Sequence, residues 1–134
     1  MSQTLYEYTL STPREDFYNI TPQVHEAVSK NGVTDGIAVV YCPHTTAGIT
    51  INENADPDVV HDLLLGLKKA FPVQMGFTHA EGNSVAHLKA SSMGSSATVI
   101  IENSELLLGT WQGLHLTEFD PPRNRKFYVK IVKS

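Results

Sequence analysis

The chain has 134 residues, 41% of them hydrophobic, which is enough to close one hydrophobic core but hardly two. Ten basic residues against fourteen acidic ones give a formal net charge of −4, which argues against a nucleic-acid-binding surface, since such a surface needs clustered positive charge. No apolar run reaches the roughly 18 residues that cross a bilayer, the start lacks the parts of a signal peptide, and the single cysteine, Cys42, cannot form an internal disulfide. We therefore expect one cytoplasmic domain over residues 1–134 that binds neither nucleic acid nor membrane.

The first thirty residues predict a strand and a helix. Residues 4–12 are rich in Tyr, Thr and Leu and precede a proline, as a strand does before a turn. Thr21 followed by Pro22 is typical of a helix cap with proline at the first helical position. The helix should end before Gly32.

Two strands and a second helix are expected next. The apolar run 36–41 predicts a buried strand, and residues 47–53 alternate between apolar and polar, as a half-buried strand does. Asp56 then caps a helix whose apolar stripe extends to Leu67 at helical spacing.

The remainder predicts a loop, a short helix and a sheet. Residues 71–83 contain proline, two glycines and mixed polarity, so we expect a loop, and residues 84–93 predict a helix that ends at Gly94. Further strands are expected over residues 97–101, 105–108, 114–119 and 127–132. Runs of strands interrupted by two or three helices indicate an α+β domain with packed sheets.

His44-Thr45-Thr46 follows the expected strand 36–41 and places an imidazole beside two hydroxyls. This combination can bind a metal, move a proton or hold a phosphate. The alternative is a turn capped by the threonines, with His44 a satisfied residue at the end of the strand. Cys42 lacks the second cysteine of a structural zinc site, so we interpret it as a small buried hydrophobic residue.

Carboxylates, amides and an imidazole are concentrated in residues 52–62, where a strand leads into a helix. Asp56 and Asp58 are explained by the positive end of the helix dipole. Glu53 and Asp62 lie outside that explanation, so they are candidate acid–base groups.

His79 and His87 lie eight residues apart across a loop-to-helix transition, and both could meet one ion only if the chain bends, as Gly82 would allow. With His44 they form a candidate three-histidine metal site with open positions for water or substrate. The alternative is three unrelated surface histidines. Imidazole ligands favour zinc or nickel over magnesium.

Candidate phosphate contacts lie in two later segments. Ser95 and Ser96 follow Gly94 in a hydroxyl-rich stretch that suits close approach of backbone N–H groups to a phosphate, although a helix cap and turn explain it equally well. Arg123 and Arg125 carry planar donors that could clamp phosphate oxygens, or they mark an exposed strand edge.

An aromatic residue and an amide occur together at an expected turn. Trp111 offers a stacking platform and Gln112 an amide, although tryptophan is more often a core or interface residue.

In order and spacing, these motifs closely resemble those of the YjbQ-like family, also called the secondary thiamine-phosphate synthase family, and the resemblance covers nearly the whole chain. The motifs are His44 to Gly48, Asn52 to Pro57, His61 to Leu63, His79 with Glu81 and Gly82, His87 to Lys89, Gly94 to Ser96, Leu108 to Gly113, and Glu118 to Asp120 with Arg123 and Arg125. The chain departs from the family at Pro121, where a glycine is usual, and at Cys42, which the family does not require.

The resemblance implies two packed sheets with two to three helices, assembled as a homotrimer with a histidine-rich pocket near the subunit contact. It also implies a weak thiamine-phosphate synthase activity, which joins a pyrimidine diphosphate to a thiazole phosphate and releases pyrophosphate. On this resemblance the metal ligands are His44, His79 and His87, and the acids are Glu53 and Asp62. The phosphate contacts are Ser95, Ser96, Arg123 and Arg125, whereas His115 is incidental.

We therefore expect a small-molecule enzyme with a metal that neutralises diphosphate charge or activates water, while Glu53 or Asp62 moves a proton and His44 takes part in the chemistry. Further expected substrate contacts are Thr45, Thr46, Asn52, Trp111 and Gln112. Magnesium is the usual helper of diphosphate transfer, so the synthase activity could be a side reaction. The alternatives are a non-catalytic metal- or metabolite-binding trimer and a metal-dependent hydrolase of a small metabolite.

Overall fold

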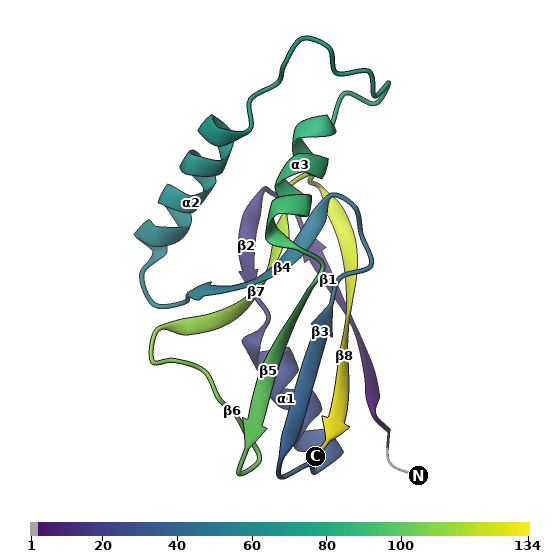
Figure 1. Cartoon of the computed structure of the whole chain (residues 1–134), viewed down its shortest axis with the longest axis vertical. Coiled ribbons are helices and arrows are strands. Elements are labelled where there is room, and N and C mark those ends of the chain that lie inside the picture. The colour runs from purple at the N-terminus through teal and green to yellow at the C-terminus, as the bar shows by residue number, and fades with distance from the viewer. Residues whose placement is uncertain (1–2) are drawn as a thin grey trace.

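The computed structural model describes residues 3–134 as two antiparallel sheets and three helices (Figure 1). The elements in chain order are β1 (Leu5–Thr12), β2 (Asp16–Asn19), α1 (Thr21–Asn31), β3 (Gly36–Tyr41), β4 (Ala47–Glu53), α2 (Pro57–Ala70), α3 (Ser84–Met93), β5 (Ser96–Glu102), β6 (Glu105–Leu106), β7 (Gln112–Glu118) and β8 (Arg123–Lys133). The predicted α+β class with two packed sheets is confirmed.

The larger sheet has five strands in the order β1-β8-β3-β5-β6. Its strands alternate between the two faces, so Val40 and Ile131 point into the core while their chain neighbours Tyr41 and Val132 are 45% exposed. Ile100, on the same outer face, is 52% exposed. One face of this sheet is therefore covered by the core, and the other presents apolar side chains to solvent.

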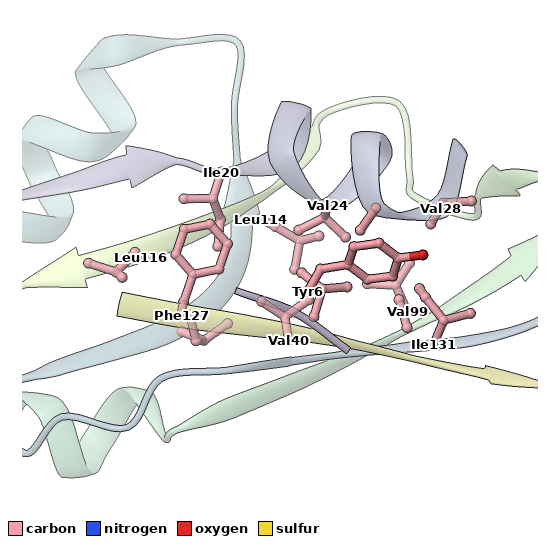
Figure 2. Packing of buried hydrophobic residues seen from close by; sticks show 14 of the residues in the cluster. Tyr6, Ile20, Val24, Val28, Val40, Val99, Leu114, Leu116, Phe127 and Ile131 are labelled. Carbon is pink, nitrogen blue, oxygen red and sulfur yellow. The ribbon is translucent and has the colours of Figure 1, made fainter. Parts of the chain in front are cut away.

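The smaller sheet has three strands in the order β2-β7-β4. Helix α1 contacts β3, β6 and β8 of the larger sheet and β7 of the smaller one, so it closes the space between the sheets. The main core fills this space, and Figure 2 shows the side chains of Leu114, Leu116 and Phe127 packed there with those of Ile20 and Val24. These side chains are fully buried.

Helices α2 and α3 lie at the end of the molecule away from α1 (Figure 1). They share a second apolar cluster with Phe17 and Phe119, to which α2 contributes the partly buried Val60, Leu64 and Leu67. No residue of α2 is fully buried, although its apolar stripe is present as expected. Asp56 caps the helix as predicted, because its side chain accepts a hydrogen bond from the Asp58 amide.

Three details of the predicted elements were wrong. The N-cap position of helix α1 is Ile20, which makes no side-chain capping bond, and Thr21 is the first helical residue. Thr21 Oγ1 instead accepts a hydrogen bond from the Leu114 amide at 2.9 Å. Strand β8 begins at Arg123 rather than Phe127, because its charged first residues still pair with β1. Strand β2 was not predicted, since only Phe17 of its four residues is buried.

No helix in residues 3–134 is long and apolar enough to cross a membrane.

Candidate functional site

The segment between β3 and β4 carries His44 and is held by backbone bonds to neighbouring elements. The Cys42 amide donates to the Ser95 carbonyl at 2.8 Å, and the Phe119 amide donates to the Thr46 carbonyl at 3.1 Å. Cys42 is 1% exposed within the main core, as interpreted from the sequence. The segment therefore has a fixed position between the two sheets.

His44 is half-buried, and its Nε2 accepts a hydrogen bond from the Lys126 amide at 2.9 Å. An accepting ring nitrogen carries no proton, so the neutral ring carries its proton on Nδ1. Burial lowers the pKa of His44, and the positive charge of Arg125 lowers it further. His44 is thus a neutral side chain with one N–H group to offer a ligand.

His79 and His87 lie together. Their ring centroids are 5.4 Å apart and the rings meet edge to face, at 86°. The bend expected at Gly82 is present, with φ at 74° and its amide donating to the His79 carbonyl. His87 is half-buried on α3, while His79 lies in the exposed loop that precedes it.

Two cavities share His44, Thr45 and His87 in their walls. The first, which we call the serine cavity, measures about 490 Å³ and is also lined by Ala90, Ser91, Gly94 and Ser95. The second, the arginine cavity, measures about 350 Å³ and is also lined by His79, Glu81, Asn83, Asp120, Arg123 and Arg125. The structure therefore brings the three predicted histidines to one pair of cavities.

The turn that forms one wall of the serine cavity is fixed by two glycines. Gly94 has φ at 90°, and its carbonyl accepts a hydrogen bond from the Ile49 amide at 3.0 Å. A Cβ on Gly48 would lie 2.7 Å from that carbonyl oxygen, so β4 and the turn meet without room for a side chain. This contact places Ser95, a predicted phosphate contact, in the cavity wall.

A buried ion pair lies behind the arginine cavity. Arg125 donates from Nε and Nη2 to the two carboxylate oxygens of Glu118, both at 2.6 Å, and from Nη2 to Thr46 Oγ1 at 2.8 Å. Thr12 Oγ1 also donates to Glu118, at 2.6 Å. Arg125 is 5% exposed, so the alternative of an exposed strand edge was wrong for this residue. Most of its donors are already engaged within the chain.

Arg123 is likewise tied to a carboxylate. Its Nη2 lies 2.7 Å from Asp120 Oδ2, and the Asn83 side chain donates to the same oxygen at 2.9 Å. The hydrogen bond from Asn83 is the largest cause that holds the pKa of Asp120 below its usual value. Both arginines predicted to clamp phosphate therefore already have acidic partners.

The predicted acids do not lie with the histidines in the single chain. Asp62 is exposed on α2, where His61 Nδ1 lies 3.0 Å from its carboxylate. Glu53 lines a third cavity, which we call the acidic cavity, together with Asp56 and His115. The catalytic roles predicted for Glu53 and Asp62 stay predictions.

Several predicted substrate contacts also lie outside both histidine cavities. Asn52 is exposed and its side chain accepts from the Glu53 amide, while Gln112 closes a turn by accepting from the Gly109 amide at 2.8 Å. Trp111 is 65% exposed and Ser96 is exposed at the start of β5. Thr45 and Thr46, in contrast, line the arginine cavity.

The three histidines do not form a ready metal site in this geometry. Among residues 3–134, no group of three or more His, Cys, Asp or Glu side chains could hold one ion. The Nε2 atom of His44 is occupied by the Lys126 amide, and a metal at Nδ1 would have to displace a proton. The residues thus do not fit a three-histidine ion without rearrangement.

Sequence reasoning gave no role to Glu118, Asp120 or Asn83. A carboxylate in a strand expected to pack through Leu114, Leu116 and Phe119 was the available signal, because a buried charge needs a partner. His115, expected to be incidental, is 2% exposed. Its burial follows from its place on the core strand β7 and not from any motif.

Fold and site together define a small α+β domain with a cavity pair lined by histidines and hydroxyls. The chain belongs to the YjbQ family, described as UPF0047 protein YjbQ-like, whose model matches residues 6–134.

Relatives of this chain include a UPF0047 protein of Methanocaldococcus jannaschii, 55% identical over 96% of this chain and 94% of the relative. The UPF0047 protein YugU of Bacillus subtilis is 49% identical over 91% of this chain and 93% of its own length.

Two solved structures are also similar. A YjbQ/UPF0047 family protein of Clostridium acetobutylicum is 61% identical, with a TM-score of 0.92 over 95% of this chain and 99% of the other. A protein of unknown function from Sulfolobus solfataricus is 30% identical, also with a TM-score of 0.92, over 97% and 96% of the two chains. These likenesses support the fold along nearly its whole length.

Proposed function

We propose that this chain is an enzyme that acts on a phosphorylated small molecule, with a phosphate group bound in the serine cavity. The observation that carries the proposal is the hydrogen bond from the Lys126 amide to His44 Nε2. Because this bond fixes the proton of the neutral ring on Nδ1, His44 offers a donor to an anionic oxygen.

The charge of the cavity walls supports this choice. The described residues that line the serine cavity include no Asp or Glu, and they offer the hydroxyls of Thr45, Ser91 and Ser95. The arginine cavity contains Glu81 and Asp120 beside Arg123 and Arg125, and both arginines are already paired with carboxylates of the chain, so they are not free to bind a phosphate. A phosphate is therefore better accommodated on the serine side of His44.

The resemblance to secondary thiamine-phosphate synthases names a specific reaction of this kind. A ring nitrogen of the thiazole phosphate would form a bond to the methylene carbon of the pyrimidine diphosphate, and the bond from that carbon to the diphosphate oxygen would break. The electron pair leaves with pyrophosphate, and the attacking nitrogen loses no proton. Donors that hold the leaving diphosphate would then be the main contribution of the protein. His44, Thr45 and Ser95, which line the serine cavity, are the residues that we propose supply them.

This reaction places little demand on an acid–base pair. Since no proton is removed from the nucleophile, the distance of Glu53 and Asp62 from the histidines is compatible with it. A hydrolase would instead need a group that deprotonates water.

A zinc or nickel ion stays a prediction of the sequence. His79 and His87 could share an ion after small movements, because their rings are already adjacent. Joining them would require His44 to give up its bond to Lys126. No step of the proposed reaction therefore uses a metal.

We also propose that the chain forms a homotrimer, as the resemblance implies. The outer face of the larger sheet supports this, because Tyr41, Ile100 and Val132 are about half exposed on it. Light scattering after size exclusion should give three times the monomer mass for the wild type. Ile100→Glu should reduce that mass, while Ser29→Glu on the exposed side of α1 should not. A monomeric wild type would contradict the proposal.

Pyrophosphate release from the two thiamine precursors tests the proposed activity. The wild type should release pyrophosphate only when both precursors are present, and His44→Ala should reduce the rate by about 10²–10³-fold, the scale of a lost catalytic donor. The control is His25→Ala, since His25 is exposed on α1. Equal rates in His44→Ala and wild type would overturn the assigned site. Binding without turnover would favour the non-catalytic alternative.

A further inference from the structure

The acidic cavity lies between β2, β7 and the N-terminal half of α2, and it shares no lining residue with the two histidine cavities. Its volume of about 510 Å³ is within the usual range for small-molecule sites. It is therefore a cavity separate from the histidine site.

Three carboxylates belong to the walls of this cavity, those of Asp16, Glu53 and Asp56. Glu53 Oε2 accepts from the Ala55 amide, and Asp56 Oδ1 accepts from the Asp58 amide. Each of these two carboxylates thus keeps a second oxygen for a ligand.

Positive charge is scarce around the cavity. Arg14 approaches Asp16 at 3.2 Å but is itself largely exposed and does not line the cavity. The described lining residues include no lysine or arginine, and the remaining titratable ones are His61 and His115. The cavity therefore favours a cation over an anion. The N-terminus of α2 does not reverse this preference, because Asp56 already caps it.

A second feature, independent of the carboxylates, also indicates a ligand. His115 is 2% exposed and lines the cavity, yet its Nδ1 is buried and has no hydrogen-bond partner in the described part of the chain. Buried polar atoms in proteins almost always have a partner. A polar group bound in the cavity would supply one.

The same cavity also has apolar lining residues. Phe17 meets the His115 ring at 6.1 Å between centroids, and Val60 and Leu64 of α2 complete the wall. An aromatic face beside carboxylates suits a cation that carries an apolar group.

We propose that the acidic cavity binds a small organic cation, with its ammonium group donating to Glu53, Asp56 and the unpartnered Nδ1 of His115 and its apolar part against Phe17, Val60 and Leu64. This site does not depend on the phosphate site proposed above, since the two share no residue. It gives Glu53 a role in binding a cation.

Benzylammonium is a suitable probe, with benzyl alcohol and benzoate as neutral and anionic counterparts of similar shape. In titrations followed by NMR, benzylammonium should shift the resonances of Phe17, Val60, Leu64 and His115, and the two counterparts should not. Shifts of equal size with benzyl alcohol, or none with benzylammonium, would overturn the proposal.

Isosteric variants test the role of charge. Glu53→Gln and Asp56→Asn should each weaken benzylammonium binding about tenfold, which corresponds to ~1.4 kcal/mol. Asparagine is itself a good helix cap, so Asp56→Asn should leave α2 in place. Glu105→Gln makes the same change of net charge on the exposed strand β6 and should leave the affinity unchanged. Unchanged binding in both cavity variants would contradict the proposal.

Discussion

Glu118 of the smaller sheet and Arg125 of the larger sheet form a two-point ion pair at the place where the sheets meet, with both nitrogen–oxygen distances at 2.6 Å. Glu118 is fully buried and Arg125 nearly so. The pair also holds Thr46, two residues from His44, so the interior of the fold is joined directly to the proposed site.

Glu118→Gln should destabilise the fold by about 3–5 kcal/mol, because it leaves the buried guanidinium without its counter-charge. Urea unfolding followed by circular dichroism, at one fixed protein concentration, measures the change. Glu26→Gln is the control, since Glu26 pairs with Lys30 on an exposed helix face and its loss should not be measurable. Equal stability of Glu118→Gln and wild type would show that the pair is not needed.

The Glu118–Arg125 pair also predicts how the stability of the fold depends on pH. Burial alone would raise the pKa of Glu118, but hydrogen bonds from Arg125, Thr12 and the Asp120 amide outweigh it and hold that pKa below its ordinary value of 4.5. The stabilisation is therefore present above pH 4.5 and is lost as the pH falls through the lower pKa of the folded state. As the pH is lowered below 4.5, the free energy of unfolding should decrease steeply in the wild type and less steeply in Glu118→Gln. Parallel curves would contradict this assignment.

His115 should make the stability of the fold depend on pH in a higher range than Glu118 does. Burial lowers its pKa, and the attraction of Asp16 only partly offsets this effect. Below its ordinary pKa of 6.5, His115 is protonated in the unfolded chain but stays neutral in the folded chain. The free energy of unfolding should therefore decrease as the pH decreases. Between about pH 7 and about pH 5, His115→Leu should show a smaller loss of stability than the wild type. An identical loss in both proteins would mean that His115 does not titrate as described.

Gly48→Ala should disturb the serine cavity through its wall. The new Cβ would lie 2.7 Å from the Gly94 carbonyl oxygen and 3.0 Å from Met93 Cβ, so α3 and its His87 would have to move. Over-packing of this kind costs about 1–3 kcal/mol. Thermal unfolding measures the cost, and NMR shifts at His87 report the movement.

Gly66→Ala is the matched control for that variant. Nothing lies within 4 Å of a Cβ at this position on the exposed side of α2. Alanine favours the helix over glycine, so the variant should be stabilised by up to about 1 kcal/mol. A loss of stability here would mean that Gly66 packs against something the single chain does not contain.

Much of the fold could be predicted because local patterns carry it. The cap at Asp56, the glycine at the end of α3 and the apolar run of β3 each specify an element through residues close in sequence. Strand β2 could not be predicted in the same way, because only Phe17 of its four residues is buried and so no apolar pattern marks it.

The candidate site was predicted in part for the same reason. Histidines in motifs identify the polar segments, and the fold brings His44 to the wall that His87 lines. Sequence alone could not show that Arg125 is turned inward to Glu118, or that Glu53 lines a cavity with His115 and not with His44. These are relationships across sheets, which depend on register and burial.

Calorimetric titration with pyrophosphate tests the central claim most directly, because it measures the proposed phosphate site without assuming a complete substrate. The wild type should bind one pyrophosphate per chain, His44→Ala should bind at least about tenfold more weakly, and His25→Ala should bind as the wild type does. Equal binding by wild type and His44→Ala, or none by the wild type, would contradict the account.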